Sequence, residues 1–308
     1  QIGGPAPDSP GPDLVGTIVG GEGTLGIVTK VWVRLTRNPQ GCRTMLGVFD
    51  SVDDATQAIS GIIGAGIIPA ALEMMDHGIL VAVEEAFHFG FPLDAEAILL
   101  IEVDGLEVGL DAQRDRVAAI CTEHGAREVR FAKDAKERLQ LWKARKQAFG
   151  AIGRLSPSYC TQDGVVPRTK LPHILTRIRA ISEKYNVRVV NVFHAGDGNL
   201  HPILLFDERH PDEIKRVLAA SSEILQECLD CGGSVTGEHG IGLEKISFMN
   251  RMFNDDDLAA MTRLHDALNP TGLLSRGKLL PTCGACGSEQ LHPGRRAAAP
   301  LSVGAQER

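Results

Sequence analysis

Residues 187–202, VRVVNVFHAGDGNLHP, join the strongest strand signal of the chain to a polar, glycine-rich turn. The run 187–193 is dominated by valine, which is typical of a buried β-strand. His194 and His201 flank the turn, so both imidazoles can curl toward one ion. Imidazole is the commonest ligand for divalent transition metals, and sites often lie at strand ends. Taken alone, these residues fit a metal site and a pair of ordinary hydrogen-bonded loop histidines equally well.

A second glycine-rich loop, residues 232–242 (GGSVTGEHGIG), contains the adjacent pair Glu238 and His239. Adjacent side chains point in different directions, so one could bind a metal while the other acts as a base. The alternative is a helix N-terminus with an unrelated acid. Two such loops in one chain favour a metal site in which His194, His201 and Glu238 are ligands and coordination positions stay open. Zinc, manganese and iron all suit this donor set.

The rest of the chain alternates between β-branched runs and helical patterns, which predicts a sheet covered by helices, α/β or α+β. A capping Ser51 followed by two acids predicts the start of the first long helix. Strands are expected at Leu14–Val19, Ile27–Leu35, Thr44–Phe49, Ile67–Met75, Ala95–Val103, Glu128–Ala132, 160–166 and Val187–Phe193. Helices are expected to about Ala65 and near 76–89, 108–125, 134–152, 170–185, 210–231 and 255–268.

The composition is that of an ordinary globular protein, and it argues against nucleic-acid-binding and membrane-spanning proteins. The chain has 308 residues, enough for about two domains. Its net charge of −7 argues against bulk binding to nucleic acid or anionic lipid. The longest apolar stretch, residues 58–75, contains Pro69 and Glu73 and is too short to span a bilayer.

The seven cysteines are an odd, scattered set that predicts a reducing compartment rather than a disulfide framework. Two Cys-x-x-Cys pairs, Cys228–Cys231 and Cys283–Cys286, have the form of zinc ligands. The gap between the pairs is long, and the second pair lies in a tail rich in Gly, Ala, Pro and Arg. We therefore interpret them as buried or incidental thiols.

Several stretches occur in the order found in a known family: IVGGEGTLGIVTKVWVRL (18–35), NVFHAGDGNLHP (191–202), GSVTGEHGIGLEK (233–245) and NPTGLLSRGK (269–278). The chain resembles the C-terminal part of FAD-linked oxidases of the vanillyl-alcohol-oxidase type. ALEMMD (71–76) and residues 141–168 favour the glycolate oxidase branch over the D-lactate and D-2-hydroxyglutarate dehydrogenases.

The resemblance implies an α+β fold in which the end of an FAD-binding domain precedes a substrate or cap domain with a mostly antiparallel sheet covered by helices. Residues 1–37 would be the remnant of the FAD-binding domain, 38–282 the substrate domain and 283–308 a disordered tail. The start at Gln1, in a loop-like segment, fits a fragment of a longer subunit.

Site residues are implied by motif. His194, His201 and Glu238 would hold a divalent metal and His239 would be the general base. Arg145, which by itself reads as a solvated helix charge, would bind the substrate carboxylate, with Asn199 and Lys278 as further substrate contacts. The FAD would be lined by Asn199 and by the loop residues Glu22, Gly23, Leu25, Gly26 and Ile27.

Three positions, 275, 276 and 149, depart from patterns found in the family. Ser275 and Arg276 replace the usual Asn-Pro before Gly277, which puts a contact from Ser275 in doubt. Phe149 stands where relatives acting on 2-hydroxyglutarate have a threonine. An apolar residue there suits a small substrate without a second carboxylate.

The implied activity is FAD-dependent oxidation of a small 2-hydroxy acid, glycolate, to the 2-oxo acid. The alternatives are a D-lactate dehydrogenase, a metal-dependent hydrolase and an inactive fragment without the FAD pyrophosphate site. The resemblance also implies a second flavin-domain-like subunit and an iron–sulfur subunit as partners, with no nucleic acid. It implies a cytoplasmic location, or a peripheral one at the inner membrane through partner subunits, without an integral membrane segment.

Overall fold

The structure is a computed structural model that describes residues 1–4 and 11–281. The chain divides into two compact units: residues 33–239, and residues 1–32 together with the described residues from 240 onward. The expected domain boundaries, 1–37 and 38–282, stay a prediction. The expected tail, 283–308, and with it Cys283–Cys286, lies outside the described residues.

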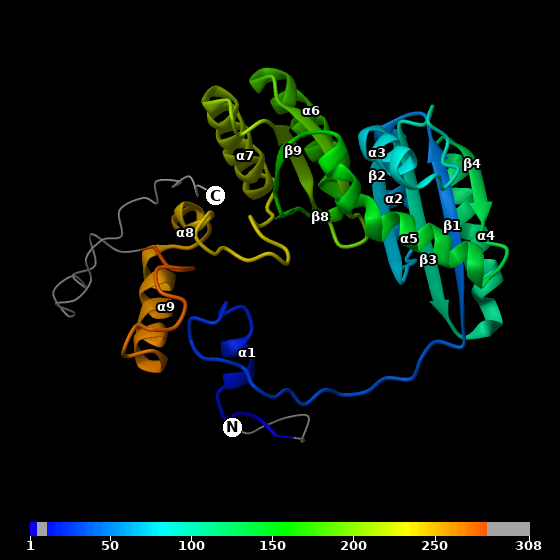
Figure 1. Cartoon of the computed structure of the whole chain (residues 1–308). Helices are drawn as coiled ribbons and strands as arrows, with labels where there is room; N and C mark the ends of the chain where they lie inside the picture. The colour runs from blue at the N-terminus through cyan, green and yellow to red at the C-terminus, as the bar shows by residue number, and fades with distance from the viewer. Residues whose placement is uncertain (5–10, 282–308) are drawn as a thin grey trace. The chain divides into compact units, whose positions relative to one another are not determined.

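The unit of residues 33–239 is built on a sheet with the strand order β4-β1-β3-β2-β7-β8-β6, while β9 pairs with both β7 and β5 (Figure 1). All strand pairs of the described residues are antiparallel, which confirms the predicted α+β class and mostly antiparallel sheet. The strands are β1 (Gly41–Phe49), β2 (Ala71–Asp76), β3 (Ala97–Gly105), β4 (Ala126–Phe131), β5 (Ser158–Thr161), β6 (Gly164–Val165), β7 (Arg188–His194), β8 (Asn199–Leu200) and β9 (Pro202–Phe206).

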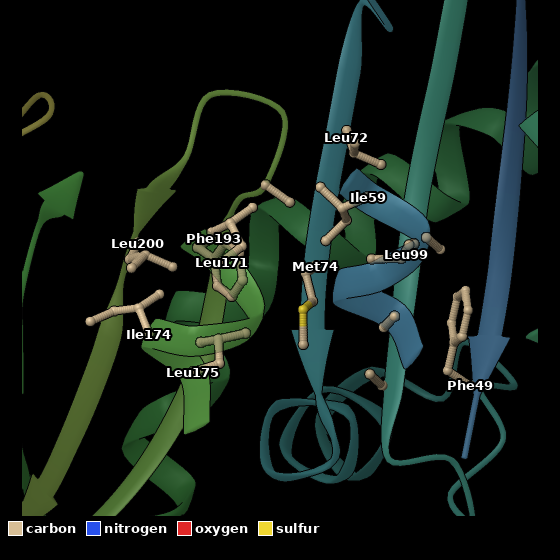
Figure 2. Packing of buried hydrophobic residues seen from close by; sticks show 14 of the residues in the cluster. Phe49, Ile59, Leu72, Met74, Leu99, Leu171, Ile174, Leu175, Phe193 and Leu200 are labelled. Carbon is tan, nitrogen blue, oxygen red and sulfur yellow. The ribbon is translucent and has the colours of Figure 1, made fainter. Parts of the chain in front are cut away.

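Helices cover both faces of the sheet because successive strand residues point to opposite sides. One face packs under α2 (Val52–Gly64), α4 (Glu107–Glu123), α6 (Leu171–Tyr185) and α7 (Pro211–Asp230). Figure 2 shows this layer, with Ile59 of α2 over Met74 and Leu99, and Leu171 of α6 beside Phe193. The other face packs under α3 (His77–Phe87) and α5 (Ala135–Ala151). The functional side chains described below lie at one end of this second layer.

Local signals place these elements where the sequence predicts them. The Ser51 hydroxyl accepts a hydrogen bond from the Asp54 N–H at 3.3 Å and begins α2, as expected from its capping pattern. Strands β1, β3, β4 and β7 and helices α2 to α7 and α9 (Asp255–Leu268) confirm predicted elements to within a few residues.

Two predicted strands are wrong. Residues 14–19 form the short helix α1 (Leu14–Ile18), which begins where the Asp13 carboxylate accepts from the Gly16 N–H. Residues 27–35 form no strand, and Ile27, Trp32 and Leu35 are 77%, 82% and 88% exposed. A β-branched run becomes a strand only when a neighbour supplies hydrogen bonds and packing, and no described strand pairs with this one.

Smaller differences have local causes. The strand expected from residue 67 begins at Ala71, after Pro69, which lacks an N–H for pairing. The strand expected over 160–166 is divided into β5 and β6 because the chain changes partner, from β9 to β8. The sequence reasoning did not identify β9 or the short helix α8 (Ile246–Met252).

The second unit contains α1, α8, α9 and loops held together by two polar side chains. The Glu22 carboxylate accepts from the backbone N–H of Ile241 at 2.7 Å and of Gly242 at 2.9 Å. Asn269, 4% exposed, donates from Nδ2 to the Thr24 carbonyl at 3.1 Å. Loops far apart in the sequence are thus joined within this unit. No helix among the described residues is both long and apolar enough to cross a bilayer.

Asp76 links β2 to α3 at the sheet end. Its Oδ1 accepts from the Ile79 N–H at 3.1 Å, and its Oδ2 accepts from the Asn191 N–H at 2.6 Å. Burial raises the pKa of Asp76 to about 6, although these hydrogen bonds oppose the rise. The carboxyl group therefore titrates within the working range of stability measurements.

We expect Asp76→Asn to gain stability relative to the wild type as the pH rises from about 4 to about 7. A carboxyl with a folded pKa of about 6 and an unfolded pKa of about 3.9 binds protons better in the folded state. Its contribution to stability is therefore greatest at low pH and is lost as the pH rises through 6, by up to about 3 kcal/mol. Urea unfolding across this pH range checks the change. A difference between the two proteins that does not vary with pH contradicts it.

Candidate active site

The turn after β7 brings the two motif histidines together, as the sequence predicts. His194 ends β7 and pairs with Asn199 of β8. Gly198 has φ +75°, and a Cβ there would lie 2.2 Å from the Val166 carbonyl oxygen, so the turn requires glycine. The ring centroids of His194 and His201 are 5.4 Å apart.

The second motif loop is held by a residue that the sequence reasoning missed, Asp163. This carboxylate is fully buried, and its Oδ2 accepts from the Thr236 hydroxyl at 2.7 Å. The same oxygen accepts from the backbone N–H groups of Gly237 at 2.9 Å, Glu238 at 3.1 Å and His239 at 2.9 Å. Asp163 therefore sets the backbone path that presents Glu238 and His239.

The pKa of Asp163 reflects this environment. Burial acts to raise it, but the contact with His201, the Thr236 hydroxyl and the backbone N–H groups of His239 and Glu238 hold the pKa well below its usual range. Asp163 is therefore an ionised carboxylate at neutral pH, and it faces the histidines from inside the protein.

The two loops converge on one group of potential metal ligands. Asp163, His201, Glu238 and His239 each offer one ligand atom within 4.8 Å of the others. His201 Nε2 lies 3.2 Å from Glu238 Oε1 and 3.4 Å from Asp163 Oδ1. His194 Nε2 lies 3.4 Å from the same Glu238 oxygen. The structure thus brings together the three predicted ligands and adds Asp163 beside them.

Some buried polar atoms at this site make no hydrogen bond. His201 is 2% exposed, yet neither Nδ1 nor Nε2 makes a hydrogen bond, and Asn199 Oδ1 is likewise buried without one. Leaving such atoms unpaired is costly, and native proteins do so mainly at functional positions. A Cβ on Gly237 would lie 2.7 Å from the Asn199 amide, so this glycine allows Asn199 its place. The donor set and the imidazole nitrogens without a hydrogen bond fit a divalent cation.

Arg145 reaches the site from α5, but not as a solvated charge. It is 7% exposed, and its Nε donates to Glu73 Oε2 at 2.9 Å. Glu73 Oε1 in turn lies 2.8 Å from His194 Nδ1. The hydrogen bond with Glu73 raises the pKa of His194 above its ordinary value, while burial opposes the rise. Glu73 is the second residue that the sequence reasoning missed.

Two aromatic rings also contact the imidazole of His201. The His239 ring stacks on it with a centroid distance of 5.0 Å and an interplanar angle of 20°. The Phe149 ring meets it edge-on at 6.2 Å. His239 and Glu238 are exposed in this unit, so both are accessible to a small molecule.

The predicted FAD-lining residues lie in the other unit. Gly23, Leu25, Gly26 and Ile27 border a hollow of about 520 Å³, together with residues 273–275. Glycine-lined walls suit the close approach of a planar ring. The Glu22 carboxylate is occupied by backbone N–H groups, and its contact with FAD stays a prediction. Lys278 also belongs to this unit and is exposed.

Of the two Cys-x-x-Cys pairs, the structure describes Cys228–Cys231. Cys228 is buried and Cys231 is half-buried, at the end of α7. The group around His201 is the one candidate metal cluster among residues 1–4 and 11–281, and it contains no cysteine.

Comparison with known proteins gives a consistent result. Residues 38–279 match the family model "FAD linked oxidases, C-terminal domain". The glycolate oxidase subunit GlcD of Escherichia coli (strain K12) is 46% identical over 296 residues, which cover 95% of this chain and 59% of that protein. The mitochondrial D-lactate dehydrogenase (cytochrome) of Arabidopsis thaliana is 28% identical over 273 residues, 88% of this chain and 48% of that protein. The chain therefore spans about half to three fifths of the length of these relatives.

A solved structure has a similar fold. The crystal structure of p-cresol methylhydroxylase with substrate bound superposes with a TM-score of 0.59 at 14% identity. The match covers 77% of this chain and 52% of that one. At this identity the likeness shows the fold alone.

Proposed function

Because this chain belongs to the family of FAD linked oxidases, C-terminal domain, we propose that it carries the substrate site of an FAD-dependent enzyme that oxidises a small 2-hydroxy acid. Glycolate is the proposed substrate and its 2-oxo acid the product, in view of the 46% identity to the glycolate oxidase subunit. The observation that carries the proposal is the buried imidazole of His201, which makes no hydrogen bond and lies amid Asp163, Glu238 and His239.

We propose His194, His201 and Glu238 as the residues that hold a divalent metal. Zinc, manganese and iron remain alternatives, because this donor set suits each of them. When bound, such an ion acts as a Lewis acid that lowers the pKa of a substrate hydroxyl. Asp163 lies within ligand distance, but its carboxylate is already occupied by the 236–239 backbone.

The protein groups around the ligands have complementary roles in this proposal. His239 takes the proton of the substrate hydroxyl, because an imidazole is suited to proton transfer near neutral pH. Arg145 binds the substrate carboxylate and so orients the reacting carbon. Its guanidinium is buried and ion-paired with Glu73, with Nη2 2.8 Å from Glu73 Oε2. Asn199 and Lys278 are proposed as further substrate contacts.

FAD, when bound, would supply the redox chemistry as the hydride acceptor. Gly23, Leu25, Gly26 and Ile27 are proposed to line it, since they border a glycine-walled hollow. Glu22 and Asn199 are proposed as further FAD contacts. The division into a remnant of an FAD-binding domain, 1–37, and a substrate domain, 38–282, belongs to the same proposal.

The main alternative is a D-lactate dehydrogenase, which the 28% identity to the plant enzyme supports. Phe149, whose ring lies 6.2 Å from that of His201, suits a small substrate without a second carboxylate under both alternatives. A panel of glycolate, D-lactate and D-2-hydroxyglutarate with the FAD-loaded protein separates the two. Since one relative is described as a subunit, we also propose a second flavin-domain-like subunit and an iron–sulfur subunit as partners, with cytoplasmic or peripheral inner-membrane location.

We expect the purified chain to bind about one divalent ion and His201→Ala to lose it. His201 is the most buried of the three proposed ligands, and its removal leaves only His194 and Glu238 of that set. Elemental analysis after dialysis against each metal measures the content. His173→Ala, at an exposed histidine on α6, is the control and should keep the ion. No metal in the wild type, with and without FAD and substrate, would contradict the proposed ligand set.

A further inference from the structure

Glu73 is a carboxylate in the middle of the sheet. It lies on β2, opposite Leu100 of β3 and opposite His194 of β7, and is 7% exposed. Met75, on the same side of the strand, belongs to the apolar layer under α3 and α5. A carboxylate at such a position destabilises the fold unless both its oxygens are paired. Its partners therefore matter.

Both partners are residues that the proposed function uses. Oε1 lies 2.8 Å from His194 Nδ1, and Oε2 accepts from Arg145 Nε at 2.9 Å. Arg145 is itself 7% exposed, so water does not compete for this contact. One buried side chain thus joins a proposed metal ligand to the proposed carboxylate-binding arginine.

The contact determines which nitrogen of His194 carries the proton. An ionised carboxylate only accepts hydrogen bonds, so Nδ1 must be the donor. The neutral ring then presents a lone pair at Nε2, the atom that lies 3.4 Å from Glu238. Carboxylates that hold metal-binding histidines in this way orient the ring and raise its basicity.

The same carboxylate orients Arg145. With Nε committed to Glu73, the plane of the guanidinium is set. Nη2 lies 2.8 Å from the same oxygen but is not aligned for a hydrogen bond, and it has no other hydrogen-bond partner. The guanidinium is therefore held by its Nε–Nη2 edge, which faces the Glu73 carboxylate.

We propose that Glu73 is a positioning residue that holds His194 in the Nδ1–H tautomer and Arg145 in its substrate-binding orientation. This inference rests on the proposed function, because it assigns His194 to a metal and Arg145 to a carboxylate. Glu73 touches neither the ion nor the substrate. It acts through both of its partners at once.

The test compares Glu73→Gln with Glu102→Gln in the whole 308-residue chain. A glutamine at 73 accepts from Arg145 only by turning its amide N–H toward His194 Nδ1, which moves the ring proton to Nε2. We expect Zn²⁺ affinity, measured by competition with a chelator, to fall about 10–100-fold. We also expect the ¹⁵N shifts of the His194 ring to change from the Nδ1–H to the Nε2–H pattern.

Glu102 is a matched control. It is also 7% exposed, lies on the neighbouring strand β3, and pairs with Arg138 and Trp142 of α5. Glu102→Gln should keep wild-type Zn²⁺ affinity and His194 shifts. A loss in Glu73→Gln alone supports the inference, whereas a loss of equal size in both variants shows a general effect of the packing and overturns it.

Two further results separate this inference from the proposed function. If His194→Ala loses Zn²⁺ while Glu73→Gln binds it like the wild type, the positioning role is wrong and the ligand set stands. If His194→Ala binds Zn²⁺ normally, the ligand set itself is wrong, and the inference falls with it. Should Glu73→Gln fail to fold, the wild-type spectrum decides, because an Nε2–H tautomer of His194 overturns the proposal.

Discussion

Replacement of His239 by alanine is expected to lower the kcat for glycolate oxidation by about 10²–10⁴-fold in the FAD-loaded protein. Among the described residues 236–242, Glu238 is the one other exposed base beside the metal ligands. Because Glu238 is itself a proposed ligand, it cannot take over the role of the imidazole. The proposed contact of the substrate carboxylate with Arg145 would remain, so the dissociation constant of glycolate should change little. Steady-state kinetics and equilibrium binding measure the two quantities.

A loss of metal could imitate this result, because the His239 ring stacks on His201 at 5.0 Å. The metal content of His239→Ala must therefore be measured beside its kinetics, and we expect it to equal that of the wild type. His210→Ala is a suitable control, since His210 is an exposed histidine that precedes α7. Turnover equal to the wild type in His239→Ala would remove His239 as the base.

Much of this site could be predicted because its motifs are local. His194 and His201 are separated by one turn, and Glu238 and His239 are adjacent, so residue type and spacing already indicate the chemistry. The convergence of the two loops could be expected only as a hypothesis. It depends on Asp163, which holds the 236–239 backbone from a different part of the sheet.

The missed residues share a property. Glu73 and Asp163 are single acids inside apolar or strand-like runs, at 58–75 and 160–166. Their roles depend on partners 72 and more positions away, since Glu73 meets Arg145 and His194 only after β2 pairs with β7. A lone acid in a predicted buried strand is the available signal, because such a group needs a charged or hydrogen-bonding partner.

The fold shows the same division between local and long-range information. Caps such as Ser51 place helices accurately, but strands also need partners. Residues 27–35 have strong β propensity and no partner among the described strands, so they form none. On α5, Arg138, Trp142 and Arg145 face Glu102 and Glu73 of the sheet, whereas Arg145 by itself is predicted to be a solvated helix charge.

Asp163→Ala is expected to lower the free energy of unfolding by about 3–5 kcal/mol, because it removes a buried charge from a complete hydrogen-bond set. The Thr236 hydroxyl and the N–H groups of Gly237, Glu238 and His239 would lose their acceptor. These hydrogen bonds are part-buried, and leaving their donors without an acceptor costs free energy beyond the loss of the bonds. Urea unfolding followed by near-ultraviolet circular dichroism measures the loss.

The loop should also lose its order, which distinguishes Asp163 from a residue that only packs. We expect Asp163→Ala to bind Zn²⁺ more weakly, because Glu238 is no longer held near His201. Asp53→Ala, at an exposed carboxylate that lies 3.9 Å from Arg179, is the control and should change stability by well under about 1 kcal/mol. If Asp163→Ala matched the control in both stability and Zn²⁺ affinity, the 236–239 loop would be held by its own backbone.

Asp163→Asn refines the result, since one remaining oxygen can still accept from the loop while its amide N–H faces the His201 nitrogen. That variant should recover part of the stability without recovering the metal.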